Sequence, residues 1–196
     1  SHLNKNITTQ IGDSRIFLIR HGETNWNKEG RFQGQIDITL NDKGKNQARK
    51  TFEYLRNISF NKAFSSSMHR PYETAQIILQ NNKDLKIEKI DSLVEISHGL
   101  WEGKLEAEIK EQWPSLLKNW HDKPEKVIMP DGESIKDVSE RSLLAFNKIC
   151  LSQKANDLTL LVAHDAVNKT LICNIFGISY SNIWMIKQGN GGITVI

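Results

Sequence analysis

RIFLIRHG, residues 15–22, is the stretch of sequence that decides the fold. Its apolar run is short and bounded by polar residues. This is the pattern of a strand that a sheet buries on both faces, so we predict a strand over Arg15–Ile19. A second run of the same kind, LTLLVA, predicts a strand over Leu158–Ala163. Both strands lead directly into a histidine.

Helical and extended patterns alternate along the rest of the chain. Helices are expected over Asp42–Arg56, Arg70–Gln80, residues 134–153 and Ala166–Phe176, and strands over Lys62–Phe64, Ile87–Ile90 and Gly192–Ile196. This alternation predicts an α/β fold with a mainly parallel sheet. The Trp- and Pro-containing region of about 98–131 is expected to form a small helical cap. We therefore predict a loose N-terminus over 1–14 and a single domain over 15–196.

The composition excludes several classes of protein. With 38% hydrophobic and 25% charged residues among 196, neither a disordered chain nor a fibre is indicated. The longest apolar runs are four residues, too short to cross a membrane. The formal net charge of +3 suits a small anionic ligand and falls short of the charge typical of nucleic-acid binding. We thus expect neither a membrane nor a nucleic acid as partner.

The N-terminal residues and the two cysteines give further expectations. Ser1-His2 resembles the remnant of a cleaved tag, so the chain may be part of a longer protein. No signal peptide is recognised, and the cytoplasm is the expected compartment. Cys150 and Cys173 lack the spacing of a metal site and are expected to be buried thiols.

The candidate functional residues follow predicted strands. Arg20 and His21 follow the first strand, and His164 follows the strand Leu158–Ala163. In open α/β sheets ligands lie outside the carboxyl ends of the strands, so these side chains are expected at one site. Arg70 opens a helix after the serines of a third strand, where two arginines could bind a phosphate. Glu95 adds a carboxylate in an apolar context.

These residues lie in segments that resemble, in order along the chain, the motifs of the histidine phosphatase superfamily in its phosphoglycerate-mutase-like branch. The matching segments are FLIRHGETNWN at 17–27, RFQG at 31–34, LNDKG at 40–44, SSSMHRPYETA at 65–75, Glu95 with GLWEG at 99–103, DGES at 131–134 and VAH at 162–164. The resemblance spans nearly the whole chain. It implies a three-layer α/β/α fold with a small helical cap.

The resemblance also implies the roles of the residues. His21 would be the nucleophile that takes the phosphoryl group, and Glu95 would protonate the leaving oxygen and then deprotonate water. The groups that would bind the phosphate oxygens are Arg20, Arg70, His164 and Asn27. Further candidates for substrate contact are Glu23, Thr24, Gln33, Gly34, His98 and Trp101, although Trp101 could equally pack in the core. No cofactor and no metal are expected, because the cationic cluster takes the place of a metal.

The activity that we expect is metal-independent hydrolysis of a small phosphorylated metabolite. Only 69 residues separate Glu95 from His164, fewer than in the cofactor-dependent mutases, whose insert helps to close the site. Phosphoserine, α-ribazole phosphate and a sugar phosphate are the candidate substrates. A phosphoglycerate mutase and an inactive regulatory domain of a longer chain are the alternatives. The final strand, if it is an exposed edge, could pair two copies into a homodimer.

Asp165 departs from the family pattern, which has Gly or a small polar residue after the second histidine. A carboxylate at this position would repel a phosphate if it pointed into the pocket. We therefore expect it to turn outward or to cap the helix Ala166–Phe176.

Overall fold

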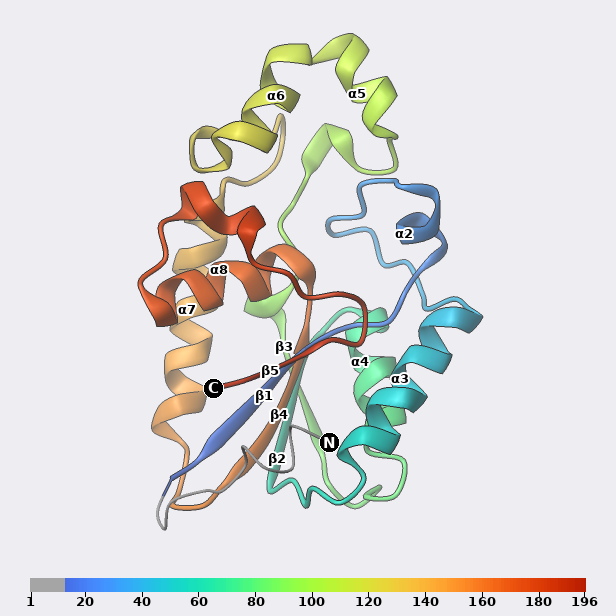
Figure 1. Ribbon diagram of the computed structural model, residues 1–196, viewed down its shortest axis with the longest axis vertical. Coiled ribbons are helices and arrows are strands. Elements are labelled where there is room, and N and C mark those ends of the chain that lie inside the picture. Colours follow the sequence, from blue (N-terminus) through green and yellow to red (C-terminus); the bar gives the residue numbers. More distant parts are fainter. Residues whose placement is uncertain (1–12) are drawn as a thin grey trace.

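A five-stranded sheet lies at the centre of the structure, a computed structural model that describes residues 13–196 (Figure 1). The strand order is β3-β2-β4-β1-β5. The strands are β1 (Arg15–Arg20), β2 (Lys62–Ser66), β3 (Ile87–Ile90), β4 (Leu158–Ala163) and β5 (Ile193–Val195). All neighbours are parallel except β5, which runs antiparallel to β1. The prediction of a mainly parallel α/β sheet is confirmed.

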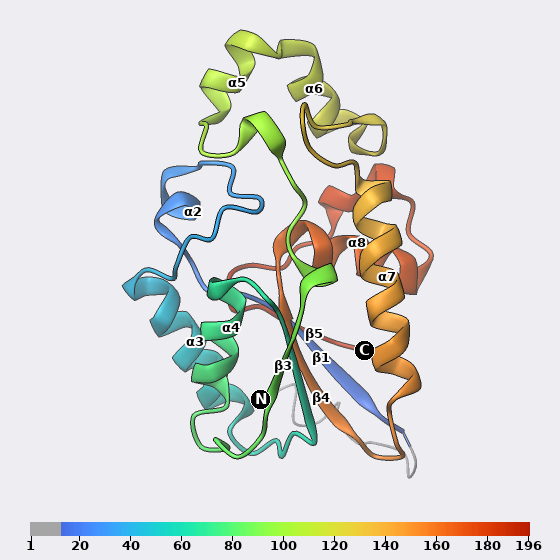
Figure 2. The same ribbon diagram turned by 180° about the vertical axis from the view of Figure 1, so that it is seen from behind.

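Two layers of helices cover the sheet. Helices α3 (Asp42–Leu55) and α4 (His69–Ile78) lie on one face, and α7 (Ile135–Leu151) and α8 (Asp165–Phe176) on the other (Figures 1 and 2). Alternate side chains of β1 serve both layers: Phe17 and Ile19 pack with α3 and α4, whereas Ile16 and Leu18 pack with α7 and α8. The strand therefore needs apolar residues at every position, and this is why its sequence reads as an uninterrupted run.

Capping residues set the ends of the predicted helices. The Asn41 side chain accepts a hydrogen bond from the Gly44 amide and begins α3. Ser134 and Asp137 form a reciprocal capping box that begins α7. At the end of α8, Gly177 adopts a left-handed conformation with φ of 66°, which glycine accepts without strain. The observed bounds of these helices lie within two residues of the predicted ones.

The cap stands over the carboxyl ends of the strands and holds α5 (Glu106–Gln112) and α6 (Pro114–Asp122) (Figure 1). Buried Ile109, Leu117 and Trp120 join it to Ala166 and Val167 of α8 in one apolar cluster. The predicted small helical cap is therefore present. Shorter 3₁₀ turns cover Asp91–Leu93, Gly99–Trp101, Pro124–Lys126 and Tyr180–Met185.

Three expectations need revision or fall outside the described chain. Helix α2 (Asn25–Glu29) lies between the first predicted strand and the first predicted helix, where the sequence predicts no helix, and a Thr24–Asn27 capping box begins it. Cys150 is exposed on α7 rather than buried, while Cys173 is buried as expected. Most of the predicted loose N-terminus, residues 1–12, lies outside the described residues. Within residues 13–196, no helix combines the length and apolar character needed to cross a bilayer.

Candidate active site

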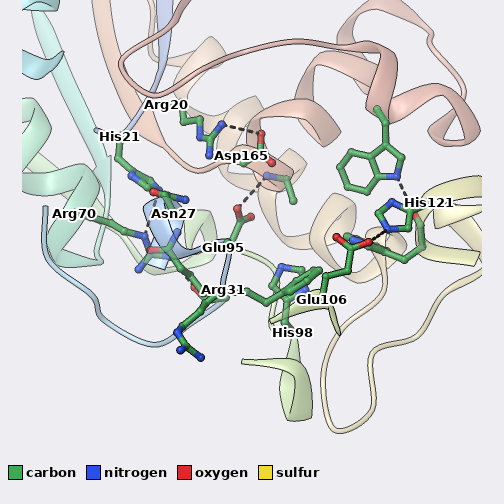
Figure 3. A pocket seen from close by; sticks show the side chains of 17 residues that line it. Arg20, His21, Asn27, Arg31, Arg70, Glu95, His98, Glu106, His121 and Asp165 are labelled. Atoms are coloured by element: carbon green, nitrogen blue, oxygen red, sulfur yellow. Dashed lines mark hydrogen bonds and ion pairs between the residues drawn. The ribbon is translucent and has the colours of Figure 1, made fainter. Parts of the chain in front are cut away.

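A cavity of about 380 Å³ lies between the carboxyl ends of the strands and the cap (Figure 3). Its lining comes from β1 and the following loop, from α4 and α8, and from the cap. The lining residues are Arg20, His21, Asn27, Gly30, Arg31, Phe32, Gln33, Gly34, Arg70, Glu95, His98, Glu106, Trp120, His121, Asp165, Ala166 and Trp184. The predicted meeting of the residues that follow β1, β2 and β4 is thus observed.

His21 follows β1 and is held by hydrogen bonds to both of its ring nitrogens. Nδ1 lies 2.6 Å from the Gly22 carbonyl oxygen, to which it donates. The Arg70 Nε–H donates to Nε2 at 3.2 Å. Both bonds require the tautomer that keeps the lone pair on Nε2. Burial and the Arg70 charge lower the pKa of His21 well below its usual value, so the ring is neutral at pH 7. The Nε2 lone pair, which accepts the Arg70 Nε–H, can act as a nucleophile when that donor turns to a substrate oxygen.

Arg70, at the start of α4, is buried and fixed by the loop that follows β1. Its two terminal nitrogens donate to the Gly34 and Ile36 carbonyl oxygens, each at 2.8 Å. Burial lowers the pKa of Arg70 to about 10, so the guanidinium keeps its charge at pH 7. Arg20 supplies a second guanidinium, which donates to the Gln188 carbonyl oxygen at 3.1 Å. Two oriented cations therefore meet at His21.

His164 lies beside His21, with the ring centroids 5.2 Å apart. Its Nε2 is 2.8 Å from the Ser66 hydroxyl at the end of β2. We assign the Ser66 proton to the bond with His164, and the hydroxyl oxygen accepts the Met68 amide at 3.3 Å. Nδ1 then carries the ring hydrogen, and this buried atom has no hydrogen-bond partner within residues 13–196. His164 can thus donate to an anion, in an orientation that Ser66 sets.

Glu95 is buried where the segment after β3 meets the first turn of α8. One of its oxygens accepts the Ile96 and Val167 amides at 2.9 and 3.1 Å, and the other accepts the Ala166 amide at 3.0 Å. Burial and the nearby charge of Asp165 raise the pKa of Glu95, against the effect of these amides. A carboxyl group with a raised pKa is suited to giving and taking a proton near neutral pH.

The remaining candidates for substrate contact divide into two groups. Asn27, Gln33, Gly34 and His98 line the cavity, and burial lowers the pKa of His98 to about 4. The others do not line the cavity.

Each residue of this second group has a structural role. Glu23 accepts a hydrogen bond from Asn41 at 3.0 Å and pairs with Lys43. Thr24 caps α2 and donates to Gln33 at 2.5 Å. Trp101 is fully buried, with its ring centroid 5.4 Å from that of Phe32. The expectation of substrate contact is therefore wrong for Trp101, whose alternative reading as a core residue holds, and the cavity does not reach Glu23 or Thr24.

The expectation for the Asp165 side chain is wrong. The residue that caps α8 is His164, without a side-chain cap bond, and Asp165 itself lines the cavity. Its Oδ1 lies 2.9 Å from the Lys169 ammonium and 3.6 Å from Arg20. These two cations balance the carboxylate, which neither turns outward nor caps the helix.

The side of the cavity toward the cap holds residues that the sequence did not single out. Phe32, Trp120 and Trp184 form an aromatic wall, in which the Trp120 and Trp184 centroids are 4.9 Å apart. Glu106 and His121, from α5 and α6, pair at 2.6 Å at the rim (Figure 3). No motif spacing identifies Glu106, Trp120 or His121, because the cap brings them to the site only through its packing on α7 and α8.

Comparisons with known proteins agree with this geometry. The model of the histidine phosphatase superfamily (branch 1) matches residues 16–196. Phosphoserine phosphatase 1 of Hydrogenobacter thermophilus is 32% identical over 182 residues, covering 93% of this chain and 85% of that protein. A probable phosphoglycerate mutase GpmB of Salmonella arizonae is 32% identical over 165 residues, covering 84% and 75%. The structure of Bacillus stearothermophilus YhfR matches with a TM-score of 0.88 and 30% identity, covering 94% of this chain and 91% of that one.

Proposed function

Because this chain belongs to branch 1 of the histidine phosphatase superfamily, we propose that it hydrolyses a small phosphate monoester through a phosphohistidine at His21. One observation carries the proposal: the lone pair of a neutral imidazole, on His21 Nε2, faces a cavity that also holds two arginines and a carboxyl group of raised pKa. A neutral nucleophile approaches an anionic ester without charge repulsion.

In the first step, His21 Nε2 attacks phosphorus and the bond from phosphorus to the ester oxygen breaks. Arg20, Arg70 and His164 donate to the three equatorial oxygens, where negative charge is spread in the transition state. The hydrogen bond from Nδ1 to the Gly22 carbonyl stabilises the positive charge that develops on the ring. Glu95 gives its proton to the departing oxygen, so the product leaves as a neutral alcohol.

In the second step, Glu95 has become a carboxylate and takes a proton from a water molecule. The water attacks phosphorus and the bond to Nε2 breaks, which returns His21 to its neutral form and releases inorganic phosphate. Each group thus ends in the protonation state in which it began.

We favour hydrolysis over mutase activity because of the small cap. The segment between Glu95 and the start of α7 holds two short α-helices, α5 and α6, which are joined by the Glu106–His121 pair at an exposed rim. Water can therefore reach the phosphoenzyme. Phosphoserine, on which the named Hydrogenobacter relative acts, heads the proposed substrates, with α-ribazole phosphate and a sugar phosphate next.

Assembly and location remain predictions. The last strand, β5, lies at one edge of the sheet and could pair with a second copy. Sedimentation equilibrium would decide between a monomer and a homodimer.

Steady-state kinetics on a panel of small phosphate esters test the proposed function. The wild-type chain should release phosphate from at least one ester, and His21→Ala should lose more than about a thousandfold in kcat. His69→Ala is the matched control, because this histidine is exposed at the start of α4 and does not line the cavity. Failure of the wild-type chain to hydrolyse any ester, or full activity of His21→Ala, would overturn the proposal.

A further inference from the structure

Asp165 places a negative charge beside a site that binds an anion, and hydrolysis alone does not require that charge. The carboxylate lines the cavity, whereas Lys169, its partner at 2.9 Å, is buried behind it and does not. A molecule in the cavity therefore meets the carboxylate and not the ammonium. Both ion pairs of Asp165 are made by Oδ1, and Oδ2 takes part in neither.

The Asp165 carboxylate lies on the side of the cavity where the leaving group would lie. Glu95, which would protonate the ester oxygen, accepts a hydrogen bond from the amide of Ala166, the residue next to Asp165. Figure 3 shows Arg20, Asp165 and Glu95 pointing toward one another. Substituents on the first carbons of the departing alcohol would therefore lie near Asp165.

The charges around this position favour a cation in the alcohol. Once the phosphate engages Arg20 and Arg70, those guanidinium charges are matched by the substrate itself. Arg31 is already occupied by Glu29 at 2.7 Å and by the Gly103 carbonyl at 2.9 Å. Asp165 thus keeps one oxygen, Oδ2, that is engaged in neither ion pair and that an ammonium group of the substrate can contact.

The aromatic wall, in which Trp184 lies near the Lys169 partner of Asp165, supports the same conclusion. Trp184 already holds one ammonium, that of Lys169, 5.5 Å from its ring centroid. Trp120 and Phe32 extend the wall. The faces of such rings attract ammonium groups and offer nothing to a carboxylate.

We propose that Asp165 selects phosphate monoesters whose alcohol carries an ammonium group two carbons from the ester oxygen. The inference rests on the proposed phosphatase activity and narrows its substrate to phosphorylated amino alcohols. Asp165 is then a specificity-determining residue, which explains why a carboxylate stands beside the phosphate site.

Two pairs of nearly isosteric esters isolate the ammonium group. Phosphoethanolamine differs from 2-hydroxyethyl phosphate, and phosphoserine from 3-phosphoglycerate, by an ammonium in place of a hydroxyl. For each pair the measured quantity is the ratio of kcat/KM for the ammonium ester to that for the hydroxyl ester. The wild-type ratio should be about tenfold or more, the size expected for one hydrogen bond to a charged group.

The variant Asp165→Asn keeps the shape of the side chain and removes its charge. It should bring both ratios close to one. Asp84→Asn is the matched control, since it makes the same change of charge at an exposed position away from the cavity, and it should keep the wild-type ratios.

Two results would overturn the inference while leaving the proposed function intact. One is a wild-type ratio near one with ready hydrolysis of the hydroxyl esters. The other is an equal change for both members of a pair in Asp165→Asn, which would mean that Asp165 acts only on Arg20 or on the phosphate. Absence of hydrolysis of all four esters and of p-nitrophenyl phosphate would instead overturn the proposed function, and this inference with it.

Discussion

At His21, a hydrogen bond donated to the Gly22 carbonyl and one accepted from Arg70 decide which nitrogen keeps its lone pair. At His164, the hydrogen bond between the Ser66 hydroxyl and Nε2 sets which ring nitrogen carries the hydrogen. The two neighbouring histidines thus carry opposite chemistry: His21 can offer a lone pair to phosphorus, and His164 a hydrogen to an oxygen. The Gly22 carbonyl and the Ser66 hydroxyl, which take no part in binding the phosphate, fix this difference.

Removal of the Ser66 hydroxyl tests this arrangement. In Ser66→Ala, His164 is free to exchange tautomers, and kcat should fall about tenfold, the loss expected when one donor to the transition state is weakened. Ser66→Thr, which keeps the hydroxyl, should recover much of the activity. Ser65→Ala serves as the control, because within residues 13–196 the Ser65 hydroxyl bonds only to the neighbouring Ser66 carbonyl. Undiminished kcat in Ser66→Ala would show that His164 needs no such partner.

The pH dependence of kcat/KM reports the two titrating groups. Activity needs neutral His21, whose pKa is lowered, and protonated Glu95, whose pKa is raised. The acid limb should therefore lie well below pH 6.5, and the alkaline limb should follow Glu95 at a pH above 4.5. Because the Asp165 charge helps to raise the pKa of Glu95, Asp165→Asn should move the alkaline limb to lower pH. Profiles of both enzymes on one ester cancel the titration of the substrate; an unmoved limb, or one moved to higher pH, would contradict the assignment.

Among single residues, the sequence located those that chemistry and motif spacing mark, namely His21, Arg70, Glu95 and His164. It could not separate residues that line the cavity from neighbours that support the loop, as Thr24 and Gln33 show. Nor could it give the direction of the Asp165 side chain. That direction depends on Lys169, one turn further along α8, and on Arg20 at the end of strand β1.

At the scale of elements, Arg141 of α7 ties together the segments that hold Glu95. Its guanidinium donates to the Ser92, Val94 and Glu95 carbonyl oxygens at 2.8, 2.7 and 3.0 Å. It also pairs with Glu133 at 2.9 Å. One side chain thus joins α7 to the connection after β3, and through it to the catalytic carboxyl group.

Arg141→Lys should loosen this connection, because an ammonium cannot reproduce the planar fork of donors. The free energy of unfolding should fall by about 1–3 kcal/mol through the carbonyl oxygens left without a donor. kcat should fall as well, since Glu95 loses its fixed position. Urea unfolding and steady-state kinetics measure the two effects. Arg49→Lys, exposed on α3, should change stability by no more than about 0.5 kcal/mol, and a similar small change in Arg141→Lys would refute this role.

Even the four-residue strand β3 was predictable, whereas the five-residue helix α2 was not. Strands β3 and β4 match their predicted bounds because their patterns are bounded by turn residues. Helix α2 is five residues long, too short for a periodic pattern, and only its Thr24–Asn27 capping box could have indicated it. The 3₁₀ turn Tyr180–Met185 places Trp184 at the cavity, yet its stability comes from packing against the cap.

For the whole molecule, the modest net charge of +3 says less than the position of the charges. The three-layer fold brings Arg20 and Arg70 to one end of the sheet, beside His21 and His164, and the cap closes over them. The same cap adds Glu106, Trp120 and His121. The residues that would bind phosphate therefore follow strands of the sheet, whereas the cap adds part of the rim of the cavity.

Chelation tests whether the arginine and histidine side chains stabilise the charge on the phosphate without a metal ion. Turnover should stay within about twofold in excess EDTA at constant ionic strength, because guanidinium and imidazole donors stabilise the transition state directly. Phosphate release before and after chelation is the measurement. Loss of activity that added divalent metal restores would show that the side chains are not sufficient.

Trapping of the phosphoenzyme tests the central claim most directly. The chain is mixed with a ³²P-labelled ester, quenched within milliseconds, and the label is located by peptide mass spectrometry. The account predicts a phosphoryl group on His21 that is stable in base and labile in acid, that disappears as free phosphate forms, and that is absent from His21→Ala. Turnover of the ester with no labelled protein at any time, or label on another residue that persists in His21→Ala, would contradict it.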